Sequence, residues 1–275
     1  METIGSVQSW SKRDIRPIAE KQTSVWDASR AIGQQPTSRA KMTNTLHRYS
    51  DHYAFERIPN PEPVQDDYIV FAMSSRGIND DNLVEKYRTF LSLALKHEPV
   101  NIGDATKGGL IRPRQDMNPT AHWRREHGPD AERVMAGIDG PTTVAAVFDN
   151  YQAMKDFVEE LKAADLGISI NISAPINEAQ RCCRESDVSR HSVEYSVGFR
   201  GRVDKLPDAT TLQLSTMCGH GMVSANFAKK MLEWVKENRR TPEEAARYMA
   251  RFCICGVFNI ARAERILSEA RLMNR

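Results

Sequence analysis

The stretch TTVAAVFDNYQAMKDFVEELKAADLGISINIS, residues 142–173, decides the predicted fold. Residues 142–148 are an apolar run typical of a strand, and residues 166–173 form the next strand. Between them, apolar side chains recur at helical spacing over residues 149–165, with Asp149 or Asn150 as the N-cap. A β–α–β unit of about 30 residues is typical of a right-handed parallel crossover, and it indicates a mixed α/β fold.

The pattern continues on both sides of this unit. A second strand–turn–helix unit precedes it, and after it the chain passes from strands to helices alone. The expected elements are strands over residues 68–73, 99–103, 191–199 and 210–216, and helices over 80–96, 174–185, 222–237, 241–253 and from 259 onward. We therefore predict a polar arm over residues 1–65, an α/β body over 66–216 and a C-terminal helical layer over 217–275.

Composition excludes several classes of protein. The 275 residues are 40% apolar and 27% charged, and 38 basic against 36 acidic side chains leave a net charge of +2, which predicts no nucleic-acid footprint. No run approaches the length of a membrane span, and residues 1–5 lack the features of a signal peptide. We expect a cytoplasmic protein, in which thiols stay reduced and clustered cysteines indicate metal binding or catalysis.

The N-terminal 65 residues are poor in apolar periodicity, and Pro59, Pro61 and Pro63 form a stiff connector. Such an arm becomes ordered on the body of the protein or on a partner. We expect a homo-oligomer, or a subunit of a complex, assembled through this arm. The alternative is a tail without fixed contacts.

A long, basic segment over residues 104–141 has the pattern of a functional loop. Guanidinium groups bind carboxylate or phosphate through paired hydrogen bonds, so the loop predicts a site for a small anionic substrate. The candidate substrate-binding residues are Arg112, Arg114, Arg124 and Arg125, with Arg200 and Arg202 as competitors. The alternative is a solvated loop with ordinary ion pairs.

Three cysteines and a histidine stand at the ends of predicted elements. Cys218 and His220 lie in Met-Cys-Gly-His-Gly, residues 217–221, between a predicted strand and a predicted helix. A helix N-terminus there would lower the pKa of the Cys218 thiol. Cys253 and Cys255 precede Gly256, which predicts a left-handed helix end whose turn brings both sulfurs together.

These residues predict a metal centre with Cys218, Cys253 and Cys255 as ligands. Three thiolates suit a [4Fe–4S] cluster with one open iron, whereas inclusion of His220 suits tetrahedral zinc. Three buried cysteines packed as small apolar groups, with no metal, are the remaining alternative. The adjacent Cys182 and Cys183 belong either to a core or to the fourth ligand position.

The five residues 217–221 resemble the catalytic-cysteine motif of the proline racemase family, in which a thiol acts as acid and base on an amino-acid α-carbon. That family carries its motif early in a longer, two-lobed chain and needs a second cysteine in its own glycine-rich motif. Here the motif is late and helices follow it. We therefore keep only the thiol chemistry, as an alternative.

The first functional hypothesis is an iron–sulfur enzyme, lyase or reductase-like, that acts on a small anionic metabolite by elimination, desulfuration or reduction. His220 or His191 would transfer protons. The second is a metal-free thiol enzyme with Cys218 as nucleophile or acid/base. The third is a non-catalytic subunit stabilised by zinc or by packed thiols.

Overall fold

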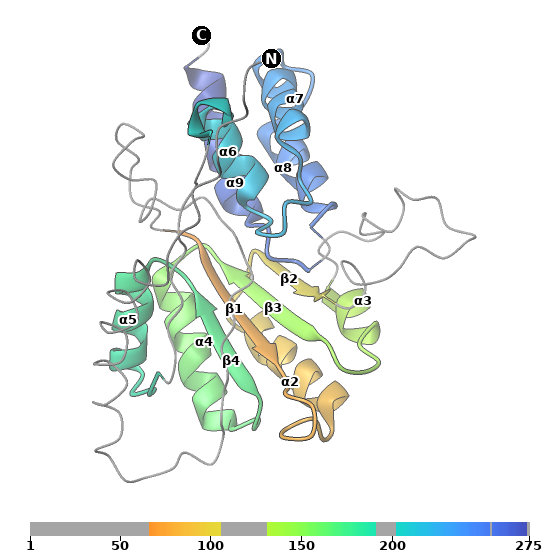
Figure 1. Ribbon diagram of the computed structural model, residues 1–275, viewed down its shortest axis with the longest axis vertical. Helices are drawn as coiled ribbons and strands as arrows, with labels where there is room; N and C mark the ends of the chain where they lie inside the picture. Colours follow the sequence, from red (N-terminus) through yellow and green to blue (C-terminus); the bar gives the residue numbers. More distant parts are fainter. Residues whose placement is uncertain (1–65, 106–130, 191–201, 254, 274–275) are drawn as a thin grey trace, which may run out of the picture. The chain divides into compact units, whose positions relative to one another are not determined.

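The computed structural model describes residues 66–105, 131–190, 202–253 and 255–273, all within one compact unit of the chain. The mixed α/β fold predicted from the sequence is confirmed (Figure 1). The strands are β1 (Tyr68–Met73), β2 (Asn101–Asp104), β3 (Thr143–Phe148) and β4 (Ser169–Ser173). The helices are α2 (Leu83–Leu95), α3 (Ala131–Ala136), α4 (Tyr151–Ala164), α5 (Ile176–Glu185), α6 (Ala209–Thr216), α7 (Ala225–Lys236), α8 (Pro242–Ala250) and α9 (Ile260–Leu272), with a short 3-10 helix, η4 (Val203–Lys205).

The four strands form one sheet in the order β2-β3-β1-β4, and every neighbouring pair is antiparallel. The strands β1 and β2 therefore run in the same direction with β3 between them, and β3 and β4 do so with β1 between them. Each β–α–β crossover is split by a strand of the other, which is the ferredoxin-like arrangement. The predicted crossover from β3 through α4 to β4 is present, but its two strands do not pair with each other.

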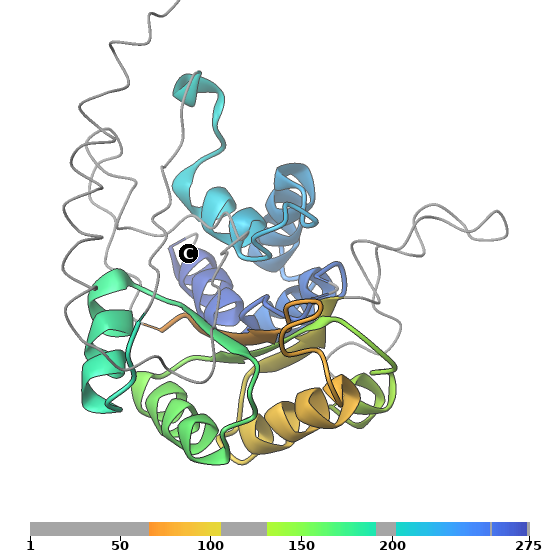
Figure 2. The same cartoon turned by 60° about the horizontal axis from the view of Figure 1, so that its bottom comes forward.

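One face of the sheet is covered by α2 and α4 (Figure 2). Val70, Val144 and Ala146 point into the core on this side, where the rings of Phe90 and Phe157 meet edge to face at 5.1 Å. Helix α4 begins where predicted, because the Asn150 side chain accepts a hydrogen bond from the backbone N–H of Ala153.

The opposite face of the sheet is covered by the C-terminal helices (Figure 2). Ile69, Phe71, Ala145 and Val147 alternate with the residues of the first core and pack against α6 to α9. Because β1 and β3 are buried on both faces, they read as continuous apolar runs in the sequence.

A buried polar network ties the C-terminal helices to the start of β1. The Arg262 guanidinium of α9 donates to Asp67 Oδ2 at 3.2 Å and to Gln213 Oε1 of α6 at 2.9 Å. Asn259, the predicted cap of this helix, accepts from the Arg262 backbone N–H and donates to Asp67 Oδ1 at 3.1 Å. An ion pair between Arg265 and Asp66 lies beside this network.

Residues 210–216 were predicted as a strand, and this prediction is wrong because they form helix α6. Their β-branched residues favour a strand, but Asp208 accepts hydrogen bonds from the backbone N–H and the hydroxyl of Thr211, and so caps a helix. Leu214 is then fully buried among the C-terminal helices. Tertiary packing outweighs the local preference.

The predicted loop over 104–141 contains helix α3 at its described end. The Arg88 side chain holds this segment, because it donates to the carbonyl oxygens of Met135 and Ile138. The N-terminal arm, most of the basic loop and the predicted strand 191–199 lie outside the described residues. No helix in the described ranges has the length and apolar character needed to cross a membrane.

Candidate functional site

The three cysteines singled out from the sequence lie together in the core between the sheet and the C-terminal helices. The Sγ atoms of Cys253 and Cys255 are 3.8 Å apart, and the thiol of Cys218 is hydrogen-bonded to Cys253. The Nδ1 atom of His220 is 3.4 Å from Cys255 Sγ. Two segments about 35 residues apart in sequence thus bring four soft or borderline donor side chains to one place.

Cys218 and His220 are placed by a glycine turn that reverses the chain between α6 and α7. The backbone N–H of Gly219 donates to Thr216 O at 2.8 Å, and Gly219 and Gly221 have φ angles of +79° and +71°. Such left-handed conformations favour glycine. The turn therefore directs the Cys218 side chain into the core and leaves His220 at the surface.

Cys253 and Cys255 are placed by the turn that joins α8 to α9. Helix α8 starts with the predicted capping box of Thr241 and Glu244 and ends at Ala250. The backbone N–H of Gly256 then donates to Cys253 O at 3.2 Å, with φ of +74° at Gly256. As the sequence predicted, the chain leaves the helix here, and both sulfurs point into the same core.

The edge strand β2 holds this turn in position. A Cβ atom at Gly103 would lie 2.5 Å from Gly256 Cα and nearer still to the Cys255 carbonyl, so two backbones touch where both residues are glycine. The Asn101 side chain also donates to Phe258 O at 2.9 Å. The sulfur-bearing turn is therefore fixed to the sheet by backbone contact.

Gly103 and Asn101 were not predicted as part of the site. The sequence contained a signal, because a glycine inside a strand often marks a place where another backbone approaches closely. Which backbone approaches could not be known without the fold.

The prediction that the pKa of the Cys218 thiol is lowered is wrong. The hydrogen bond with Cys253 raises the pKa of Cys218, and burial raises it further. The physical reason is the location of the helix ends: Cys218 follows the C-terminus of α6, and α7 starts only at Ala225. The sulfur therefore does not lie in the first turn of α7, and the hydrogen bond and burial favour the protonated thiol.

The spacings within the cluster can be compared with those of metal sites. Tetrahedral zinc bonded to sulfur at about 2.3 Å and to nitrogen at about 2.05 Å requires S–S edges of about 3.8 Å and S–N edges of about 3.6 Å. The observed separations are 3.8 Å and 3.4 Å. Nevertheless, within the described ranges no three His, Cys, Asp or Glu side chains already converge so that they could hold an ion, so binding would require side-chain rotation.

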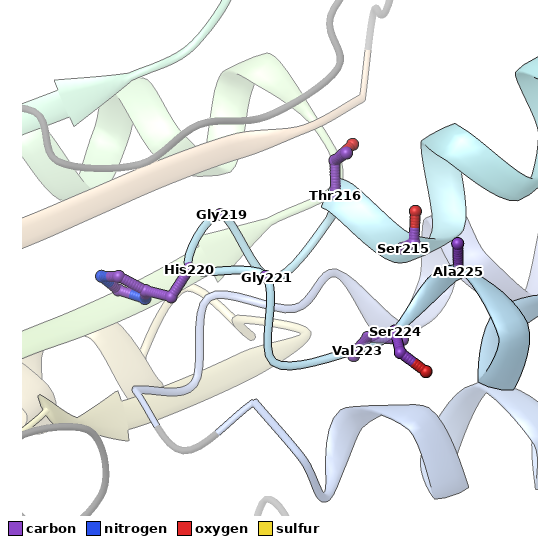
Figure 3. Close-up of a pocket in the computed structure, with 8 residues that line it drawn as sticks. All are labelled: Ser215, Thr216, Gly219, His220, Gly221, Val223, Ser224 and Ala225. Atoms are coloured by element: carbon purple, nitrogen blue, oxygen red, sulfur yellow. The ribbon is translucent and has the colours of Figure 1, made fainter. Parts of the chain in front are cut away.

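A hollow of about 540 Å³ lies beside the glycine turn. Its lining comes from the end of α6, the turn and the start of α7, namely Ser215, Thr216, Gly219, His220, Gly221, Val223, Ser224 and Ala225. Figure 3 shows that the His220 ring points away from the hydroxyl groups of Ser215, Thr216 and Ser224. The imidazole thus extends toward the sheet side of the turn, where Cys255 lies.

Of the remaining candidate residues, the structure describes Arg202, Cys182 and Cys183. Arg202 is exposed and forms an ion pair with Asp204 at 2.6 Å. Cys182 lies in the core on the opposite face of the sheet, where burial raises its pKa to about 11, and the pKa of Cys183 is raised by the same cause. Outside the described residues lie Arg112, Arg114, Arg124, Arg125, Arg200 and His191.

Comparisons with known protein families, with curated proteins and with solved structures found no match to this chain.

Proposed function

We propose that Cys218, Cys253, Cys255 and His220 bind one tetrahedral metal ion, with zinc as the first candidate. The observation that carries the proposal is the meeting of the four side chains in one place: two of their separations, Cys253–Cys255 and Cys255–His220, are close to ligand–ligand edges, and Cys218 is hydrogen-bonded to Cys253. All five cysteines of the chain are free thiols.

The spacing favours a single ion over the [4Fe–4S] cluster expected from the sequence. Thiolates bound to different irons of such a cluster stand on the order of 6 Å apart, whereas Cys253 and Cys255 are 3.8 Å apart. A single ion needs only the loss of the thiol protons and small side-chain rotations. The cluster would require Cys253 and Cys255 to move apart, although the backbone of Cys255 and Gly256 lies against Gly103 of β2.

For the activity, we propose an enzyme that uses this centre as a Lewis acid toward a small anionic metabolite. Its support is the unequal exposure of the donors, because three are buried and His220 is exposed, which leaves one side of the centre accessible. The anionic substrate rests on the arginines of the basic loop. A non-catalytic metal site is the second candidate, since the cysteines belong to the core that joins the helices to the sheet.

A metal-free thiol enzyme is supported less well. A nucleophilic cysteine acts as thiolate, whereas the pKa of Cys218 is raised and its side chain is 0% exposed.

The test is metal and sulfide analysis of the full-length protein purified without oxygen. We expect about one zinc-class ion per chain, lost or weakened in Cys218→Ala, Cys253→Ala and Cys255→Ala. Cys182→Ala is the matched control, because that thiol is equally buried but on the other face of the sheet, and it should keep the metal.

If the protein contains iron and an equal amount of inorganic sulfide, the centre is an iron–sulfur cluster and the single-ion proposal is wrong. A wild-type protein without stoichiometric metal would refute the centre. Removal of the metal by a chelator separates the two candidate roles: loss of helical circular dichroism at 25 °C identifies a structural site, and retained fold with lost activity identifies a catalytic one.

For the N-terminal arm, we propose that residues 1–65 bury surface against a second subunit. Deletion of residues 1–58 should lower the mass of the oligomer measured by light scattering, and an unchanged mass would contradict the assembly role.

A further inference from the structure

We infer that Cys253 and Cys255 are a redox-active thiol pair, which hydrogen peroxide oxidises to a disulfide. The inference concerns the two thiols themselves and does not depend on the metal centre proposed above. Their Sγ atoms are 3.8 Å apart. Because a disulfide bond is about 2.05 Å long, each sulfur needs to move by half of the difference, about 0.9 Å, which rotation of the two side chains can supply.

The backbone holds the two sulfurs at this distance. The N–H of Gly256 donates to the Cys253 carbonyl oxygen at 3.2 Å, which closes a tight turn that carries both thiols. The backbone of Cys255 and Gly256 lies against Gly103 of β2, so the turn is fixed to the sheet. The pair therefore stays close without a covalent link, and side-chain movement alone can bring the sulfurs to bonding distance.

Cys255 is the thiol that peroxide reaches first. It is 5% exposed, whereas Cys253 and Cys218 are 0% exposed. Its sulfur lies 3.4 Å from Nδ1 of His220, a residue that is exposed and lines the hollow beside the glycine turn. A small molecule can thus approach Cys255 beside the imidazole, and Cys253 lies within reach to complete the reaction.

Hydrogen peroxide alone balances the reaction. The Cys255 sulfur attacks one peroxide oxygen, the O–O bond breaks, and hydroxide leaves with the thiol proton as water. Cys255 is then a sulfenic acid. The Cys253 sulfur attacks the Cys255 sulfur, the S–O bond breaks, and the second oxygen leaves as water with the Cys253 proton. Two thiols are oxidised, and one peroxide is reduced to two waters.

Cys218 is the competing partner, because its thiol is hydrogen-bonded to Cys253. A bond between Cys218 and Cys253 would join two separate turns, whereas a bond between Cys253 and Cys255 closes a ring within one turn. First attack at Cys255 favours the second bond, because the sulfenic acid then forms on the sulfur that lies 3.8 Å from Cys253.

The test maps disulfides in the full-length protein, purified without oxygen, with its metal content recorded, and then treated with hydrogen peroxide. The remaining thiols are alkylated and the protein is digested with trypsin, which cleaves after Arg251 and Arg262. Both cysteines of the pair then fall in one peptide, residues 252–262, and Cys218 falls in another. We expect peptide 252–262 to lose two hydrogens and both alkylation sites, and to regain them after dithiothreitol.

Cys182 and Cys183 are the internal control. Cys183 is 9% exposed, more than Cys255, so exposure alone would oxidise it first. We expect both to remain open to alkylation. Two variants separate the steps: Cys253→Ser should stop at a sulfenic acid on Cys255, which dimedone labels, and Cys255→Ser should give no dimedone label at Cys253.

Three outcomes overturn the inference: peptide 252–262 keeps both thiols under peroxide, it is cross-linked to the peptide of Cys218 instead, or Cys182 and Cys183 oxidise to the same extent. The metal analysis keeps this result apart from the proposed function. Stoichiometric zinc with unreactive thiols would overturn the inference and leave the metal centre standing. A protein that contains no metal but forms the disulfide would do the reverse.

Discussion

Replacing Gly103 of β2 by alanine should separate the sheet from the turn that carries Cys253 and Cys255. The new Cβ would lie 2.5 Å from Gly256 Cα and nearer still to the Cys255 carbonyl, while ordinary contact begins at 3.4 Å, so the two backbones must part by more than 0.9 Å. Overfilling a packed site costs about 1–3 kcal/mol, and we expect about 3 kcal/mol, because the opposing atoms are backbone and no side chain can rotate away.

The assay is thermal and urea unfolding followed by circular dichroism, with metal content measured in parallel. At roughly 2–4 °C per kcal/mol for a unit of this size, Tm should fall by roughly 6–12 °C. Gly140→Ala is the matched control, because a Cβ atom at residue 140 would have no atom within 4 Å and the φ of Gly140 is not positive. This variant should change the free energy of unfolding by less than about 0.5 kcal/mol. If both variants unfold at the same temperature, the reasoning about backbone contact is refuted.

Two further predictions concern charged groups. Arg262→Met should lower the free energy of unfolding, measured in urea, by about 3–5 kcal/mol, because it removes the buried ion pair between Arg262 and Asp67. Adding Asp67→Asn should restore part of this loss. Equal losses in the single and the double variant would contradict the explanation. Hydrogen bonds from Lys96 and, to a smaller extent, His97 lower the pKa of Glu160 in the folded protein. Wild type should therefore be more stable than Glu160→Gln, with the full difference present above the unfolded-state pKa of about 4.3. The difference should disappear as the pH falls through the lower folded-state pKa. Urea unfolding between about pH 7 and pH 3 measures this difference, and an advantage that grows on acidification would have the wrong sign.

Much of the fold could be predicted because the sheet and its helices follow simple patterns. The apolar run at Tyr68–Met73 and the helix after Asn150 needed only periodicity and capping. The strand order could not be predicted, because a β–α–β unit has the same local pattern whether its strands are adjacent or separated by a third. For residues 210–216 the local pattern itself gave the wrong element: they favour a strand, but capping by Asp208 and burial of Leu214 make them a helix.

The proximity of Cys253, Cys255 and His220 agrees with the prediction from the sequence, but the direction of the Cys218 pKa shift does not. Glycine beside Cys218 and Cys255 marked turns at helix ends, and the turn at Gly256 brings the sulfurs of Cys253 and Cys255 together. The predicted fall in the Cys218 pKa depended on which helix end faces the thiol. That depends on where α6 and α7 begin and end, which is the least reliable part of a sequence-based prediction.

The long sequence separations in the network around Asp67 have a consequence for synthesis on the ribosome. Asp67 bonds to Arg262, which lies 195 residues later, so the first strand emerges long before its partners exist. Until α9 is complete, the cover that α6 to α9 give to the face of the sheet with Ile69, Phe71 and Val147 is incomplete. A nascent chain stalled before Asn259 should therefore bind chaperones that recognise apolar surface, and release from them should coincide with translation of the last helix.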